Sequence, residues 1–161
     1  MSFEIKPATQ DDLSAVTQFL QPFMDAQNLL QRNSVELQLL LRHGFKAELK
    51  QDCSIVGFCA LEIYSKKLAE IQCLAVAESQ QRKGIGRQLV EACVGRAKQE
   101  KVLELLAISS SEPMFKACGF DYSLPNQKRA FFYQTQPQLQ SDADSDNPPT
   151  NDTGNDKGLP L

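Results

Sequence analysis

Apolar positions along the chain follow two spacings, one typical of strands and one typical of helices. Alternating or continuous apolar runs predict strands at 3–6, 45–50, 55–64, 68–76, 102–108, 120–123 and 129–134, with a bulge at Gly57. Spacings of three and four predict a helix from Thr9 to about Pro22, a helical stretch over 23–30, and helices after Asn33, over 84–99 and after Ser111. The order β-α-α-β-β-β-α-β-α-β predicts an α/β fold, a mixed sheet flanked by helices.

Residues 74–90 combine a strand end, a glycine-bearing loop and a helix start. The helix over 84–99 places Ile85, Leu89, Cys93 and Ala97 on one stripe. A helix start offers unpaired backbone N–H groups and partial positive charge, which together favour phosphate oxygens. Glycine at 84 and 86 removes the Cβ atoms that would keep a phosphate from the backbone. The residues predicted to bind a pyrophosphate are Gln81, Arg82, Lys83, Gly84, Ile85, Gly86 and Arg87.

Two glycines before a helix also fit a plain strand-to-helix turn on a basic surface. The common nucleotide loops are excluded, because the third glycine and acidic ribose partner of a dinucleotide loop are missing. The Gly-Lys-Ser/Thr ending of a P-loop is missing as well.

Composition narrows the class of protein. With 161 residues, 42% of them hydrophobic, and a net charge of −3, the chain fits one soluble domain. Five aspartates lie in 134–161, so the rest is nearly neutral, which disfavours nucleic-acid binding. No apolar run is long enough to span a membrane. An odd number of cysteines without a CxxC pair, and a single histidine, predict no metal site and a reducing cytoplasm.

The strand 68–76, the hexapeptide 81–86 and the pair Gly119-Phe120 together resemble the GNAT superfamily of acetyl-CoA-dependent N-acetyltransferases. The hexapeptide is similar to that family's Gln/Arg-x-x-Gly-x-Gly/Ala motif, and Gly119-Phe120 to its closing Gly-Phe. The resemblance implies a GNAT domain over 1–134. The polar, acidic residues 135–161 are expected to be disordered because they have too little apolar surface to bury.

The resemblance also implies how acetyl-CoA, the acetyl donor, is held. Its pantetheine arm is expected to pair with the main chain at Leu74 and Val76. A backbone N–H near Cys73 or Leu74 is expected to polarise the acetyl carbonyl, an interaction typically worth about 3 kcal/mol. Leu74 is therefore named both as a catalytic and as a donor-binding residue.

Glu70 is the first candidate for the base. Strand alternation predicts that Glu70 and Leu74 point to the same face, roughly 13 Å apart, so that Glu70 acts through water. The alternative is a surface carboxylate at a strand end. Glu62 is the second candidate and Glu48 the third.

The general acid is harder to assign. Many GNAT enzymes have a tyrosine where this chain has Phe115, which cannot donate a proton. The remaining candidates are Ser109, Ser110, Cys118, Tyr122 and Tyr133. A thiolate is a tolerable leaving group near neutral pH, so loss of the acid slows the reaction without forbidding it. His43 fits the capping of a helix end better than catalysis.

The N-terminal half is similar to the acetyltransferase domain of bacterial N-acetylglutamate synthases. Arg32 matches an arginine that helps to hold glutamate in that family, and its planar fork suits a carboxylate; an ordinary surface arginine is the alternative. The preceding amino-acid kinase domain of the long form is not expected here, nor arginine feedback through it. Ser109-Ser110-Ser111 and the stretch 131–137 depart from the family's substrate-binding residues, leaving Lys128 and Arg129 as substitutes.

The sequence thus predicts an acetyl-CoA-dependent N-acetyltransferase acting on a small amine, with a glutamate-like amino acid as the first candidate. A polyamine or protein amine is the alternative acceptor. A non-catalytic acetyl-CoA-binding module is the alternative class. A homodimer stays open.

Overall fold

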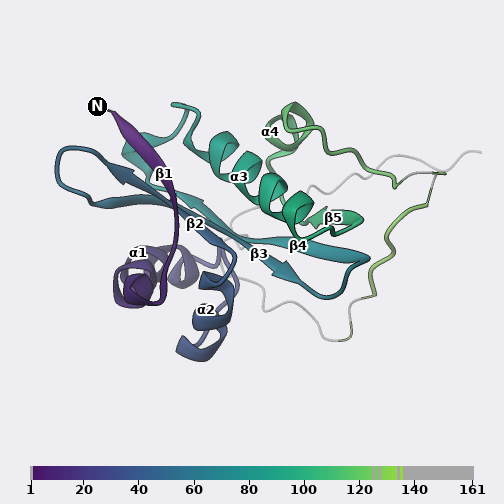
Figure 1. Cartoon of the computed structure of the whole chain (residues 1–161), viewed down its shortest axis with the longest axis horizontal. Helices are drawn as coiled ribbons and strands as arrows, with labels where there is room; N and C mark the ends of the chain where they lie inside the picture. The colour runs from purple at the N-terminus through teal and green to yellow at the C-terminus, as the bar shows by residue number, and fades with distance from the viewer. Residues whose placement is uncertain (1, 125, 127, 134, 136–161) are drawn as a thin grey trace, which may run out of the picture. The chain divides into compact units, whose positions relative to one another are not determined.

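The first part of the chain folds around one five-stranded sheet (Figure 1). This computed structural model describes residues 2–124, 126, 128–133 and 135, and it groups the chain into two units, 1–129 and 130–161. The predicted boundary at 134 stays a prediction, and the predicted tail, apart from Thr135, lies outside the described residues. The strands, in sheet order, are β1 (Phe3–Pro7), β2 (Gly44–Leu49), β3 (Ile55–Ile63), β4 (Leu68–Val76) and β5 (Glu104–Ala107). All neighbours are antiparallel except β4 and β5, which are parallel.

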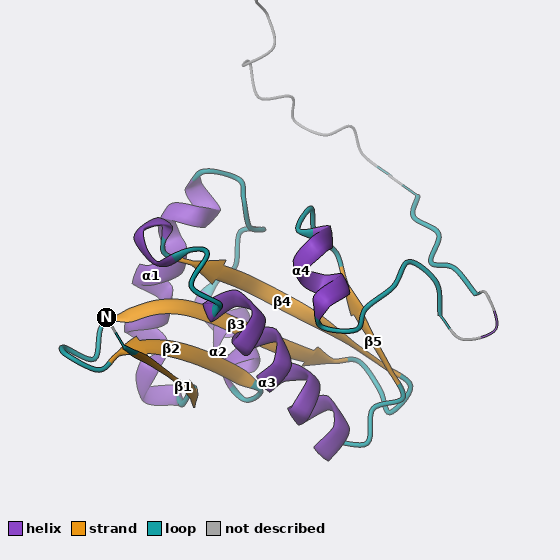
Figure 2. Ribbon diagram, turned by 90° about the horizontal axis from the view of Figure 1, so that it is seen from above, coloured by secondary structure: helices purple, strands orange, loops and turns teal. Residues whose placement is uncertain are grey.

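Helices cover both faces of the sheet (Figure 2). One face is covered by α1 (Leu13–Asp25) and α2 (Ser34–Leu41), and the other by α3 (Ile85–Gln99), with α4 (Glu112–Ala117) beside it. Short 3-10 turns, Gln10–Asp12 and Glu78–Gln80, precede α1 and α3. The apolar core forms two clusters: Val16, Leu20, Leu37, Leu41 and Phe58 belong to the first face, and Leu61, Ile71, Ile85, Leu89 and Cys93 to the second. The sequence-derived fold class is confirmed.

The first helices differ from their prediction. α1 continues to Asp25 although Pro22 lacks an N–H, because the buried stripe of Val16, Leu20 and Met24 carries the helix past it. The separate helical stretch over 23–30 does not form. Of the two caps predicted for α2, Asn33 or Ser34, the structure has Asn33, which forms a capping box: its side chain accepts from the N–H of Glu36, whose carboxylate accepts from the N–H of Asn33.

The last two predicted strands do not form within the described residues. Around 120–128 the structure has one isolated bridge, Leu124 with Lys128, and 129–133 has no regular structure. Phe131 and Tyr133 are 93% and 89% exposed. An apolar run becomes a strand only when it pairs and buries a face, and these side chains do neither.

Gly57 lies where α3 packs closely on the sheet. The bulge in β3 falls beside it, because Gly57 pairs with Ala47 while Ile55 pairs with Glu48, which leaves Val56 as the extra residue. A Cβ built at Gly57 would lie 3.0 Å from side-chain atoms of both Ile85 and Leu89. The absence of a side chain at Gly57 therefore lets α3 approach β3.

Candidate active site

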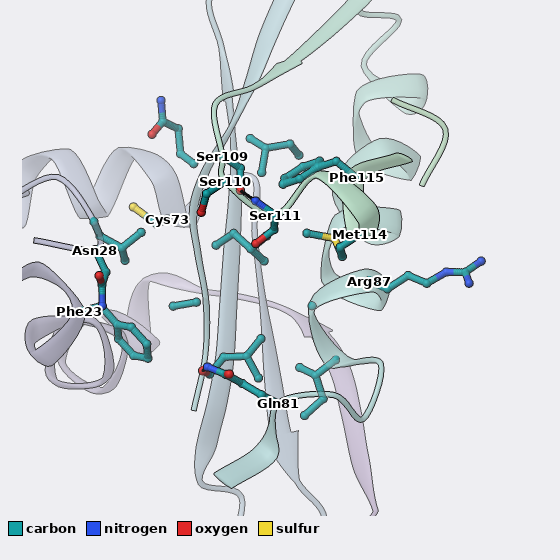
Figure 3. Close-up of a pocket in the computed structure, with 18 of the residues that line it drawn as sticks. Phe23, Asn28, Cys73, Gln81, Arg87, Ser109, Ser110, Ser111, Met114 and Phe115 are labelled. Carbon is teal, nitrogen blue, oxygen red and sulfur yellow. Dashed lines mark hydrogen bonds between the residues drawn. The ribbon is translucent and has the colours of Figure 1, made fainter. Parts of the chain in front are cut away.

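A cleft opens where β4 and β5 part. The two strands pair only from Leu68 opposite Glu104 to Ile71 opposite Ala107. Beyond that point, Gln72–Val76 have no partner on the β5 side among the described residues, and the chain after β5 turns away through Ser109–Ser111. The cleft has a volume of about 840 Å³. In Figure 3, Ser109–Ser111 lie between Cys73 on one side and Met114 and Phe115 on the other.

A bulge in β4 decides which side chains face each side of this cleft. Phe58 pairs with Ala75 whereas Ala60 pairs with Gln72, so β4 has one extra residue at Cys73–Leu74. Cys73 has φ +54°, a left-handed conformation that a non-glycine residue adopts only under strain. As a result, Cys73 joins the core cluster of the α1/α2 face and Leu74 packs against the α3 cluster.

The prediction that Glu70 and Leu74 share a face is therefore wrong. Glu70 and Gln72 point to the α1/α2 face, as the hydrogen bond between Gln72 and Arg32 shows, and Leu74 and Val76 point to the α3 face. Regular alternation fails because the extra residue reverses the facing of every later side chain. Glu70 lies on the side of the cleft formed with the α1/α2 layer.

The glycine loop forms the lower wall of the cleft. Gly84 has φ +83° and Arg82 has φ +59°, so the backbone turns sharply before α3 begins at Ile85. No described side chain caps the start of α3, which leaves its first N–H groups free for a ligand. The lining residues from this loop are Gln80, Gln81, Arg82, Gly84, Ile85, Gly86 and Arg87.

Not every basic residue of the loop faces the cleft. Lys83 does not line it; its ammonium donates to the carbonyl of Ser79 and to Oε1 of Gln80, both at 2.9 Å. Its predicted role in binding the donor is therefore not supported, because these local acceptors fold it back onto the loop. Arg87 borders the cleft, but its side chain points away from it (Figure 3). Its Nε donates to Oε1 of Glu91 at 2.8 Å.

Arg32 lies at the opposite end of the cleft. Its Nη2 donates to Oε1 of Gln72 at 3.0 Å, and its Nη1 lies 3.8 Å from Oε1 of Glu36. Its side chain is only 17% exposed, and among the described residues its buried Nε has no hydrogen-bond partner. An unpaired N–H on a mostly buried guanidinium is costly unless a ligand accepts from it. This end is also lined by Phe23, Asn28, Leu29 and Leu30.

Glu70 belongs to a carboxylate pair that the sequence indicated only in part. Glu62 and Glu70 lie directly opposite each other on β3 and β4. The Tyr64 hydroxyl donates to Oε2 of Glu70 at 2.5 Å and lies 3.4 Å from Oε2 of Glu62. Only Glu70 of the three lines the cleft. No motif in the sequence marks Tyr64 as functional, although Tyr64 follows Glu62 at the strand spacing of two.

The thiol of Cys73, which lies at the bulge, favours its neutral form. Burial raises the pKa of the Cys73 thiol, and the charge and hydrogen bond of Arg32 offset only part of this effect. A thiol that stays protonated is a poor nucleophile. Cys73 therefore shapes the cleft rather than carrying an acyl group.

The candidate acids differ in whether they line the cleft. Ser109 and Ser110 line the cleft, as does Phe115, whose ring packs edge-on against Phe120 at 5.2 Å. Cys118 and Tyr122 are not among the described residues that line it. Tyr133 falls in the second unit, which is described by itself. No candidate is thereby established as the acid.

Two further residues fall outside the cleft. Glu48 pairs with Lys46 at 2.5 Å and with Lys6 at 2.9 Å, so the third candidate base is already held by two cations. His43 follows α2, and its Nδ1 lies 3.4 Å from Nη1 of Arg96. Burial lowers the pKa of His43, which favours the neutral ring over a charged cap. The contacts of Glu48 and His43 therefore indicate structural roles rather than catalytic ones.

The cleft thus combines a sheet opened between two parallel strands with an uncapped glycine loop at the base of the gap. The model of the acetyltransferase (GNAT) family matches residues 13–120. The chain belongs to this family and is an acetyltransferase of the GNAT type.

Two curated relatives agree with this assignment. An uncharacterized N-acetyltransferase of Chlorobaculum tepidum is 32% identical over 116 residues, which cover 72% of this chain and 74% of the relative. An amino-acid acetyltransferase of Pasteurella multocida is 29% identical over 142 residues. That match covers 84% of this chain but 32% of the relative, so the chain spans about a third of that protein.

Solved structures share the fold. The Mycobacterium tuberculosis protein Rv2747, in complex with CoA and NLQ, has a TM-score of 0.66 at 23% identity, over 76% of this chain and 75% of that one. N-acetylglutamate synthase from Neisseria gonorrhoeae, complexed with coenzyme A and N-acetyl-glutamate, has a TM-score of 0.63 at 24% identity. That match covers 73% of this chain and 27% of the synthase.

The described residues contain neither a membrane-spanning helix nor a cluster of metal-binding side chains. None of their helices is both long and apolar enough to cross a membrane. Within the same residues, no group of three or more His, Cys, Asp or Glu side chains could hold a metal ion.

Proposed function

We propose that this enzyme transfers the acetyl group of acetyl-CoA to the α-amino group of an amino acid whose carboxylate binds Arg32. One observation carries the proposal: the unpaired edge of β4, the glycine loop and the unsatisfied Nε of Arg32 all border one cleft. The first two features suit an elongated phosphate-bearing donor, and the third suits an anionic acceptor.

The donor is held by backbone rather than by side chains in this proposal. The edge of β4 at Leu74 and Val76 offers main-chain groups that pair with the amide groups of the pantetheine arm. The pyrophosphate accepts hydrogen bonds from the N–H groups of the loop, which Gly84 and Gly86 leave accessible. Arg82 adds positive charge at the rim.

The acceptor enters from the α1/α2 side. Its carboxylate accepts a hydrogen bond from the Nε–H of Arg32, while Gln72 and Glu36 hold the other two guanidinium nitrogens in place. Its ammonium loses a proton through water to the Glu70 carboxylate. The freed amine attacks the thioester carbonyl and the C–N bond forms. The nitrogen then gives its second proton to water, the C–S bond breaks, and solvent protonates the released thiolate. Direct attack fits the protonated state of the Cys73 thiol.

Which amino acid fits depends on the charges at this end of the cleft. A dicarboxylate needs a second cationic or donor cluster. Among the described residues, Arg32 is the one cation lining the end near Phe23, Asn28 and Leu29, because Arg82 and Arg87 belong to the loop end. Glutamate therefore stays one member of the proposed class, beside amino acids with uncharged side chains. The names of the Pasteurella and Neisseria proteins support an amino-acid acceptor.

Replacing Arg32 tests the acceptor class. Arg32→Lys keeps the charge but removes the Nε donor, so we expect KM for the amino acid to rise about tenfold or more, a loss of about 1.4 kcal/mol, with kcat less affected. The amide of the same amino acid lacks the carboxylate and should react poorly with both enzymes. Arg42→Lys, an exposed arginine outside the cleft, is the matched control. An unchanged KM in Arg32→Lys would point to a polyamine or protein amine instead.

We further propose a cytoplasmic location, since all five cysteines are free thiols. A homodimer stays a prediction, and light scattering of the purified chain would test it.

A further inference from the structure

Tyr64 lies behind the cleft, where the β3–β4 hairpin fixes its backbone. Its N–H donates to the carbonyl of Leu68 at 3.1 Å, and the turn is closed by a second bond from Ser65 to the same carbonyl. Ser65 Oγ accepts from the N–H of Lys67 at 3.1 Å. The hairpin therefore sets the position of the Tyr64 ring relative to both strands.

The hydroxyl of Tyr64 lies beside two carboxylates that repel each other. Two carboxylates directly opposite each other on neighbouring strands repel, and Glu62 and Glu70 are such a pair. Within the described part of the chain, no ion pair involves either of them. The hydroxyl oxygen of Tyr64 lies 2.5 Å from Oε2 of Glu70 and 3.4 Å from Oε2 of Glu62. Glu70 therefore receives the shorter hydrogen bond.

The phenol remains a donor over the whole working range of pH. Partial burial, then the hydrogen bond to Glu70 and the negative charges of Glu70 and Glu62, raise the pKa of Tyr64 to about 12. Below that value the hydroxyl keeps its proton.

We propose that Tyr64 is a positioning residue for the reaction: its hydroxyl holds the Glu70 carboxylate at the cleft, ready to take the acceptor's proton through water. This inference rests on the proposed function of Glu70. Tyr64 does not line the cleft and lies beside Glu70 rather than beside the bulge. It therefore acts through Glu70 and does not protonate the leaving thiolate.

The polar groups around Glu70 come from several segments. Glu62 lies opposite it on β3, and Tyr64 reaches it from the turn after that strand. On its own strand, Gln72 accepts from Arg32, which pairs with Glu36 of α2. On β5, the partner of Glu70 is the apolar Leu106. Tyr64 is thus the direct hydrogen-bond donor to Glu70 among the described residues.

Tyr64→Phe tests the inference, since it keeps the ring and removes only the hydroxyl. We expect the ¹³C resonance of the Glu70 side-chain carboxylate at neutral pH, measured on labelled glutamate with Glu70→Gln as the assignment reference, to shift because its hydrogen-bond donor is lost. In turnover, kcat should fall about tenfold at neutral pH, with KM for acetyl-CoA unchanged.

Ser65→Ala is the matched control. It removes the bond to Lys67 and loosens the same hairpin without touching Glu70, so its Glu70 resonance and kcat should match those of the unchanged chain. A Glu70 resonance in Tyr64→Phe equal to that of the unchanged chain, or an equal shift in Ser65→Ala, would overturn the inference. A shifted resonance in an enzyme that acetylates no amine would support the role of Tyr64 and reject the proposed function instead.

Discussion

At the scale of single residues, the proposed chemistry depends on the carboxylate of Glu70. Glu70→Gln keeps the size and removes the base, so we expect kcat to fall at least about 100-fold. The affinity for acetyl-CoA should be unchanged, because Glu70 faces the α1/α2 side while the proposed donor site runs along Leu74 and Val76. Steady-state kinetics and calorimetry measure the two quantities.

Glu104→Gln is the control for this substitution, since Glu104 lies on β5 outside the cleft. Turnover in Glu70→Gln equal to that of Glu104→Gln would remove Glu70 from the mechanism.

The same residues show what sequence can predict. Glu70 and Arg32 were predicted from the family resemblance of their own segments, and both line the cleft. Lys83 was misjudged because its partners, Ser79 and Gln80, decide where its long side chain goes. The bond between Tyr64 and Glu70 joins two strands across a hairpin, and the strand register that creates it could not be read from either strand alone.

At the scale of elements, the bulge in β4 and the start of α3 shape the two ends of the cleft. Alternation predicted the strand but not the extra residue at Cys73–Leu74, since a bulge changes facing without changing composition. The loop before α3 was predictable because glycine marks positive φ, which Gly84 has.

Gly86→Val tests whether the loop approaches the donor closely. A Cβ at Gly86 would lie 3.7 Å from Val76 Cγ2, an ordinary contact, so the fold should tolerate a side chain there. The phosphate should not tolerate it, and we expect the Kd for acetyl-CoA to rise about tenfold or more, a loss of about 1.4 kcal/mol. Calorimetry gives the affinity, and a thermal melt shows that folding is intact. Unchanged affinity in a folded variant would move the donor away from this loop.

Gly57 and Gly95 make a matched pair for the packing of α3. Gly57→Ala forces a methyl group against Ile85 and Leu89, so the free energy of unfolding should fall by about 1–3 kcal/mol. Gly95→Ala, inside α3 with nothing within 4 Å of its Cβ, should raise it by about 0.5–1 kcal/mol. Urea unfolding measures both. Equal effects would mean that α3 does not depend on the approach at Gly57.

At the scale of the whole molecule, a chain of charges ties the N-terminal turn to the sheet. Lys46 bonds Asp12 at 2.6 Å and also pairs with Glu48, which Lys6 contacts from the other side. The hydrogen bond from Lys46, helped by that from Lys6, outweighs burial and lowers the pKa of Glu48. A lowered folded pKa gives stability that is present above the unfolded value and lost as pH falls through the folded value.

The free energy of unfolding should therefore decrease as the pH drops below about 4.3, the unfolded value for glutamate. Glu48→Gln should be less stable than the unchanged chain at neutral pH, with the difference shrinking in acid. Glu4→Gln, a more exposed partner of Lys6, should show little of this difference. Urea unfolding at several pH values checks the slopes, and a constant gap between Glu48→Gln and the unchanged chain would contradict it.

The overall architecture was the most predictable level. The alternation in β1–β5 and the stripe on α3 gave the layers, because burial against two helix layers follows directly from periodicity. The strands expected at 120–123 and 129–134 do not form in the described part of the chain. Phe120 packs on Phe115 without pairing as a strand, and Phe131 and Tyr133 are exposed. Sequence alone does not show whether an apolar run finds a strand partner.

The measurement that tests the central claim most directly is CoA release from acetyl-CoA with a panel of L-amino acids, each beside its own amide. If one cleft holds the donor along β4 and the acceptor carboxylate on Arg32, release should be fast with at least one free amino acid and slow with its amide. Equal rates for acid and amide would contradict the role of Arg32. Tight acetyl-CoA binding without release from any member of the panel would contradict the proposed acceptor and favour a cofactor-binding module.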